Sequence, residues 1–251
     1  MQNRHPFCDI DYSYLRPPVH LLKKPTEEEI WVQGERKFYY DVEPTDKEAE
    51  TIKKFQEKWK ETMEKRKPEE SLELPKYWHT GDYLRYACTN ELKIDNMIKQ
   101  VEAHLKWCKT LENIELNENA ASYLTNGNVY IGGRDKKGIP CMVICGKGIK
   151  KVTKEDGKDL VTAMTFVLLI IKRYMLVPNY IEKFHFITDI AFTSIKPQVD
   201  LVKGVIGIFR DNFNGLSGSA FLYKPSRIFK IFWKLASAFM PKKTLQKARF
   251  I

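Results

Sequence analysis

The sequence predicts an α/β fold: a mainly parallel five-stranded sheet flanked by helices, with a small N-terminal helical subdomain and an extended N-terminal arm. Three observations support this prediction. Short apolar strands alternate with helical patterns in residues 119–251, and this order implies right-handed crossovers between parallel strands. Residues 76–118 carry helical patterns only. Residues 1–44 contain five prolines and no sustained periodicity, which is typical of an extended arm.

A long amphipathic helix is predicted after the arm, over residues 45–67. Thr45 and Glu48 have the spacing of a capping box, and Pro68 ends the pattern. The apolar stripe of this helix is narrow and consists of Ile52, Phe55, Trp59 and Met63. Because the arm has too few core-forming residues to become ordered by its own burial, we expect the arm and this stripe to contact other protein subunits.

The remaining elements are predicted from periodicity and from turn residues. Apolar residues three and four apart indicate helices, whereas short apolar runs bounded by turn residues indicate strands. In chain order, we expect helices at 80–89 and 95–109, strands at 129–131 and 139–145, a helix at 160–176, a strand at 183–190, a helix at 198–211, a strand at 219–224, a helix at 227–240 and a fifth strand at 247–251.

The helix expected at 227–240 combines an apolar face with a basic edge. Ser226 is a suitable N-cap, and Pro241 ends the helix because it has no amide hydrogen. The apolar face consists of Ile228, Ile231, Phe232, Leu235 and Phe239, and the basic edge consists of Arg227, Lys230 and Lys234. Core packing, a membrane surface and a ligand lid would all produce this pattern.

The positive charge of the chain is concentrated in its C-terminal part. The net charge is +10, and no acidic residue follows Asp211, whereas eight basic residues do. We therefore expect an anionic partner at this end: anionic lipid, nucleic acid or an acidic protein face. An ordinary solvated surface would also explain the charge. Nucleic acid is the weakest of the three partners, because no helix-turn-helix, RNA-recognition or zinc motif accompanies the charge.

Catalytic and metal-binding motifs are missing from the sequence. It contains no G-x-S-x-G, no phosphate-binding loop, no H-E-x-x-H and no G-x-G-x-x-G after a strand. Asp189 lies at a predicted strand end but has no partner base. The five cysteines lack a disulfide or zinc spacing, which suits a reducing, intracellular compartment. No apolar run reaches the length of a membrane span. We therefore predict a protein that is not an enzyme and binds no metal.

Several short motifs, in order and spacing, resemble the CRAL-TRIO domain, the lipid-binding fold of phosphatidylinositol-transfer and retinaldehyde- or tocopherol-binding proteins. The resemblance covers residues 79–251. DKKGIPCMVI (135–144) is similar to the Asp-x-x-Gly-Arg-Pro-Val strand entry of that family, and FHFITDIAFTSI (184–195) is similar to its strand ending in Asp-Leu-x-Gly. The positions that match the family's helical subdomain are Asp82, Leu84, Arg85, Tyr86, Leu92, Ile94 and Trp107.

The resemblance implies a role for the C-terminal helix. Residues 227–240 correspond to the family's gate helix, which covers a lipid pocket and touches the membrane, so its apolar face would line the pocket and its basic edge would meet headgroups. Lys247 matches the family's headgroup lysine. The headgroup glutamate of the phosphatidylinositol binders is replaced by Gly215, which puts that specificity in doubt. We expect a divergent and C-terminally shortened member, because relatives continue beyond the position of Ile251.

We therefore expect a non-catalytic accessory subunit of a larger membrane-associated complex; the alternative is a free lipid-binding or transfer protein. No cofactor is expected apart from a bound phospholipid or other hydrophobic ligand. The expected partners are protein subunits, held through the arm, and anionic membrane lipid. The sequence does not choose between a mitochondrial inner-membrane complex and a cytosolic membrane face. We also expect an elongated apolar pocket between the sheet and the helices that begin near Leu160, Gln198 and Arg227.

Overall fold

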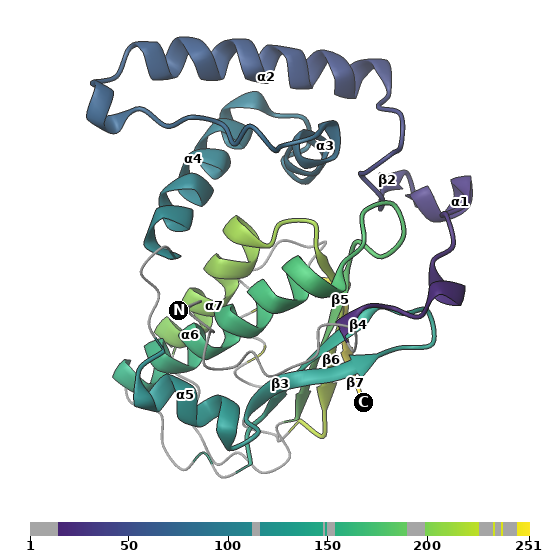
Figure 1. Ribbon diagram of the computed structural model, residues 1–251, viewed down its shortest axis with the longest axis vertical. Helices are drawn as coiled ribbons and strands as arrows, with labels where there is room; N and C mark the ends of the chain where they lie inside the picture. The colour runs from purple at the N-terminus through teal and green to yellow at the C-terminus, as the bar shows by residue number, and fades with distance from the viewer. Residues whose placement is uncertain are drawn as a thin grey trace, which may run out of the picture.

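The computed structural model confirms the predicted fold class (Figure 1). It describes residues 15–111, 116–147, 149, 154–189, 199–225, 233, 237 and 245–251, with backbone alone at 154 and 199–203. Five strands form one sheet in the order β3-β4-β5-β6-β7, antiparallel between β3 and β4 and parallel elsewhere. The strands are β3 (Val129–Arg134), β4 (Pro140–Cys145), β5 (Phe184–Asp189), β6 (Ser217–Tyr223) and β7 (Ala248–Phe250).

Three helices cover one face of this sheet (Figure 1). They are α5 (Glu118–Thr125), α6 (Lys154–Ile170) and α7 (Val199–Asn212). A π-helical turn, η4 (Ile171–Met175), continues α6 directly. The sequence did not predict α5, which begins where the Asn117 side chain accepts a hydrogen bond from the amide of Ala120 at 2.8 Å.

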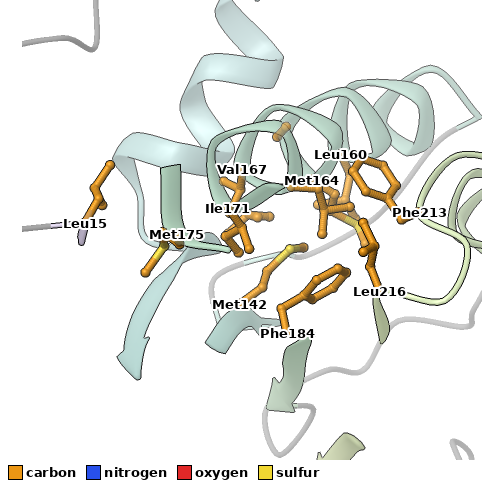
Figure 2. Packing of buried hydrophobic residues seen from close by; sticks show 13 residues of the cluster. Leu15, Met142, Leu160, Met164, Val167, Ile171, Met175, Phe184, Phe213 and Leu216 are labelled. Atoms are coloured by element: carbon orange, nitrogen blue, oxygen red, sulfur yellow. The ribbon is translucent and has the colours of Figure 1, made fainter. Parts of the chain in front are cut away.

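A tightly packed core fills the space between α6 and the sheet. Met142 and Phe184 point from their strands toward the helix and are completely buried, and Ile171 of η4 lies opposite them (Figure 2). Leu168 of α6 belongs to the same cluster and is 1% exposed. Phe213, at the end of α7, completes this cluster and is 1% exposed. The apolar face of α6 is therefore used by the core, and the part of the expected pocket formed by residues 227–240 lies largely outside the described residues.

The arm is attached to the sheet domain by a buried carboxylate. Glu182, just before β5, is 4% exposed and accepts hydrogen bonds from the amides of Tyr39 (2.8 Å), Tyr40 (3.0 Å) and Asn179 (3.0 Å). The described elements of the arm are short. They are η2 (Val19–Leu21), α1 (Glu27–Ile30) and the hairpin strands β1 (Trp31–Val32) and β2 (Glu35–Arg36). The arm is therefore held by its own chain.

The first long helix, α2 (Asp46–Glu64), begins at the predicted capping box of Thr45 and Glu48. The Glu48 carboxylate also binds Arg36 of the arm through two hydrogen bonds, of 2.9 Å from Nε and 2.7 Å from Nη2. Both side chains of this ion pair are buried. One carboxylate thus caps the helix and joins it to the arm.

The apolar stripe of α2 packs inside the molecule. It faces α3 (Thr80–Thr89) and α4 (Ile94–Leu111), which lie beneath α2 in Figure 1. Phe55 is completely buried, Trp59 is 4% exposed, and the Trp59 Nε1 donates a hydrogen bond of 3.2 Å to the carbonyl of Leu72. The expectation that the stripe contacts a partner chain is corrected: Ile52, Phe55, Trp59 and Met63 are all buried by their own chain.

Candidate functional site

The sheet face opposite α5, α6 and α7 carries a row of side chains that crosses every strand. Tyr130, Val143, Ile187, Phe221 and Arg249 are paired in register from β3 to β7. Side chains alternate between the two faces of a strand, and Phe184 and Phe186 belong to the core, so Ile187 and its neighbours face away from it. We call this surface the outer face and define it as Tyr130, Cys141, Val143, His185, Ile187, Phe221 and Arg249.

The outer face is largely apolar. Cys141 and Val143 are each 8% exposed, Ile187 and Phe221 are half-buried, and Tyr130 at the edge of the sheet is 44% exposed. The ring of Phe221 packs edge-on against His185, with centroids 5.8 Å apart. These side chains could form the floor of a site for an apolar ligand.

His185 fixes the geometry at one end of this floor. Its Nδ1 accepts a hydrogen bond from the Ser219 amide at 2.9 Å, so in the neutral ring the proton lies on Nε2, 3.4 Å from Asp135 Oδ2. The other carboxylate oxygen of Asp135, Oδ1, accepts hydrogen bonds from the backbone amides of Lys137 and Ile139, at 2.9 and 2.8 Å. The His185 ring therefore joins the β3–β4 turn to the middle of the sheet, and both of its nitrogens are in use.

Three lysines gather where β5 and β7 begin, and we call Lys37, Lys183 and Lys247 the lysine cluster. The Lys247 Nζ donates to the backbone carbonyl (2.9 Å) and the hydroxyl (3.2 Å) of Ser217. The Lys183 Nζ lies 5.9 Å from the ring centroid of Phe38, next to Lys37, and Ser217 pairs with Phe184, next to Lys183. Burial, together with the charges of Lys37 and Lys247, lowers the pKa of Lys183 to about 8. Glu35 forms an ion pair with Lys37 at 2.6 Å.

Gly215 lies in a tight turn and leaves no room for a side chain. Its φ is +71°, and a Cβ at this position would lie 2.7 Å from Cγ of Arg85 and 3.4 Å from the Tyr39 hydroxyl. A headgroup carboxylate like that of the phosphatidylinositol binders cannot be placed here without moving Arg85. The packing thus gives a physical reason for the departure at Gly215 that the sequence shows.

Most residues predicted to contact lipid or membrane lie outside the described part of the chain. These are Arg227, Ile228, Lys230, Ile231, Phe232, Lys234, Leu235 and Phe239. Within the expected helix, Trp233 is described, and its ring meets Phe250 of β7 edge-on with centroids 5.6 Å apart. The gate helix and the pocket beneath it therefore stay predictions. A hollow of about 450 Å³ lies elsewhere, lined by residues of the arm and the start of α2 such as Trp31 and Arg36.

The described ranges show neither a metal-binding cluster nor a membrane-spanning helix. They contain no group of three or more His, Cys, Asp and Glu side chains that could hold a metal ion. None of the helices in these ranges has both the length and the apolar character needed to cross a bilayer. Asp189 lies at the end of β5, where the sequence predicted it, and its backbone carbonyl accepts the Gly146 amide at 2.9 Å.

Sequence reasoning found Lys247 but missed the other two members of the lysine cluster. Lys183 alternates with His185 and Ile187 along one strand, so its face could have been predicted from the period of two. Lys37 is distant from both in sequence, and no local pattern indicates that it lies nearby. The anchoring carboxylate of Glu182 was missed for the same reason, since its two partners in the arm are more than 140 residues away.

Comparison with known proteins adds two findings. The family model of the CRAL/TRIO domain matches residues 124–251, a range that contains the whole five-stranded sheet. Among solved structures, the chain is similar to the crystal structure of Sfh5, with a TM-score of 0.60, 13% identity, and coverage of 83% of this chain and 81% of that chain. No curated protein matches the sequence. At 13% identity the likeness to Sfh5 shows the fold alone.

Proposed function

Because the chain belongs to the CRAL/TRIO domain family, whose fold is a lipid-binding domain, we propose that it is a non-catalytic carrier of a phospholipid. The acyl chains would lie along the outer face of the sheet, and an anionic headgroup would lie at the lysine cluster. The observation that carries this proposal is the row of side chains paired in register on the sheet face opposite α5, α6 and α7. It is apolar or aromatic from β3 to β6 and ends in Arg249 on β7.

Charge supports the position of the headgroup. Lys183 comes directly before β5, two residues from His185 of the outer face, so an acyl chain on the outer face would end near its ammonium group. Its pKa is lowered to about 8 with the charges of Lys37 and Lys247 among the causes, and a phosphate between these groups would relieve that repulsion. The basic helix expected at 227–240 would then meet an anionic membrane when the ligand is exchanged.

The proposal can be tested by transfer of a fluorescent phospholipid between vesicles. The purified full chain is expected to extract lipid from vesicles that contain phosphatidic acid. Lys183→Gln should weaken the preference for anionic over zwitterionic lipid by about fivefold, because one lysine near an anionic surface contributes about 1 kcal/mol. Lys158→Gln removes an exposed charge from α6 and serves as the matched control. A wild-type protein that extracts no lipid would refute the proposal.

A free carrier is favoured over an accessory subunit. The subunit hypothesis rested mainly on an arm and a stripe that seemed to need partner chains, and these are bound within the chain itself by Glu182 and by the cluster around Phe55 and Trp59. Native mass spectrometry of protein purified from its own source would decide between the two. A monomer with bound phospholipid supports the carrier, whereas a stable assembly with other chains would support the subunit.

A further inference from the structure

A second, polar hollow lies at the junction of the helical subdomain and the sheet domain. It has a volume of about 20 Å³ and is lined by side chains from α3, α4, η4 and the end of α7. Two of its lining residues are the cations Arg85 and Lys172. A space of this size holds at least one water-sized group. It is separate from the outer face and from the lysine cluster.

Arg85, which lines this hollow, carries a hydrogen-bond donor that lacks a partner among the described residues. The residue is 8% exposed, and its Nε is buried without a hydrogen-bond partner among the residues that the structure describes. The guanidinium carbon lies 5.0 Å from the ring centroid of Tyr40 and 5.8 Å from that of Tyr39, so two aromatic faces hold it in place. Buried donors in proteins nearly always have a partner, so this atom indicates a missing acceptor.

Lys172 adds a second cation to the same hollow. Burial lowers the pKa of its ammonium group, and the charge of Arg85 lowers it further. The structure gives Lys172 no ion pair or hydrogen bond with any residue that it describes. These two like charges line one small hollow, and each disfavours the charged form of the other.

The Asp82 carboxylate offsets only part of this positive charge: it raises the pKa of Lys172, but one cation stays in excess. Asp82 is the one carboxylate in the described lining, and its oxygens accept hydrogen bonds from the Tyr40 hydroxyl at 2.6 Å and the His79 amide at 3.0 Å. Burial lowers the pKa of His104 to about 4, so its ring is neutral at physiological pH. The Nδ1 of His104 is paired with Asn212 Oδ1 at 3.1 Å.

We propose that this hollow is a binding site for a small oxyanion of the phosphate type, held between Arg85 and Lys172. An oxyanion supplies the acceptor that the Arg85 Nε lacks and the negative charge that the two cations need. Because α3 and η4 each provide one cation, a bound anion joins the helical subdomain to the sheet domain. The same chemistry is available from free phosphate and from the phosphate of a lipid headgroup.

The test is phosphate titration of the full chain at constant ionic strength, followed by calorimetry and by thermal unfolding. Wild-type protein is expected to bind inorganic phosphate saturably with a rise in Tm. Glycerol 3-phosphate is run in parallel: tighter binding of this compound identifies a lipid headgroup as the source of the anion, and tighter binding of inorganic phosphate identifies the free ion.

Lys172→Met is the diagnostic variant. It should weaken phosphate binding at least tenfold and raise the Tm measured without phosphate, because a half-buried cation beside Arg85 is removed. Lys158→Met, which removes an exposed lysine from α6, should leave both quantities unchanged. Arg85→Lys provides a second variant that keeps the charge but loses the Nε donor, and it should also weaken binding. Phosphate binding by Lys172→Met equal to that of the wild type, or no saturable binding by the wild type, would overturn the proposal.

Discussion

Replacement of Trp59 by alanine tests whether α2 is an internal brace. Trp59 is 4% exposed, its ring lies 5.8 Å from that of Phe55, and its Nε1 donates to the Leu72 carbonyl at 3.2 Å. Truncation of a buried tryptophan to alanine costs about 3–5 kcal/mol, since it removes apolar contacts and leaves a cavity. The loss of a partner for the Leu72 carbonyl adds about 1 kcal/mol.

We therefore expect Trp59→Ala to lower the free energy of unfolding by about 4 kcal/mol or more, measured on the isolated chain by urea unfolding and circular dichroism. At about 2–4 °C per kcal/mol for a chain of this size, the Tm should fall by about 8–16 °C. The neighbouring substitution Lys60→Ala is the control, because that side chain is 80% exposed and makes a single 3.9 Å contact with Glu64. It should change stability by less than about 0.5 kcal/mol.

The reasoning would be refuted if Trp59→Ala behaved like Lys60→Ala. A stability loss below about 1 kcal/mol would mean that the stripe is not part of the core of the isolated chain. The stripe would then again be a candidate surface for a partner subunit, and the free-carrier proposal would lose its main argument.

Three further predictions concern single residues. Glu182→Gln replaces one acceptor oxygen by a donor that faces the Tyr39 amide, so it should lower the free energy of unfolding by about 1–3 kcal/mol and expose the arm to limited proteolysis. An arm as protected as in the wild type would contradict the anchoring role of Glu182. Gly215→Ala should cost about 1–3 kcal/mol in thermal unfolding, because φ is positive and the added Cβ would meet Arg85 at 2.7 Å. The pKa of His104 falls from 6.5 to about 4 on folding, so its contribution to stability is complete above pH 6.5 and is lost as the pH falls toward 4, by about 3 kcal/mol. His104→Gln, compared with the wild type across this pH range, should remove that part of the pH dependence.

The fold was predictable from the sequence wherever the signals are local. The capping box of Thr45 and Glu48 starts a helix at the predicted position. The short apolar runs bounded by turn residues correspond to β4 and β5. The parallel order of the sheet followed from the alternation of strands and helices. These features depend on residues within a few positions of one another.

Features that depend on tertiary contacts were not predictable in this way. An apolar stripe needs a partner surface, and the sequence does not say whether α3 and α4 or another chain will supply it. A lysine is expected on the surface by default, and the partial burial of Lys172 and Lys183 results from elements that are distant in sequence. The site was therefore predicted in part: Lys247 is at a strand entry as expected, whereas the lysine cluster around it was not foreseen.

The anchoring of the arm by Glu182 also has a consequence for biosynthesis. The amides of Tyr39 and Tyr40 are separated from this carboxylate by 143 and 142 residues. At about 5–20 residues per second, a ribosome needs roughly 7–28 seconds to make the intervening chain. During that interval the Glu182 carboxylate does not yet exist for the arm to bind. Contacts between residues so distant in sequence also form slowly. Docking of the arm is therefore a late event in folding on the ribosome, and chaperones or proteases meet the arm before its anchor exists.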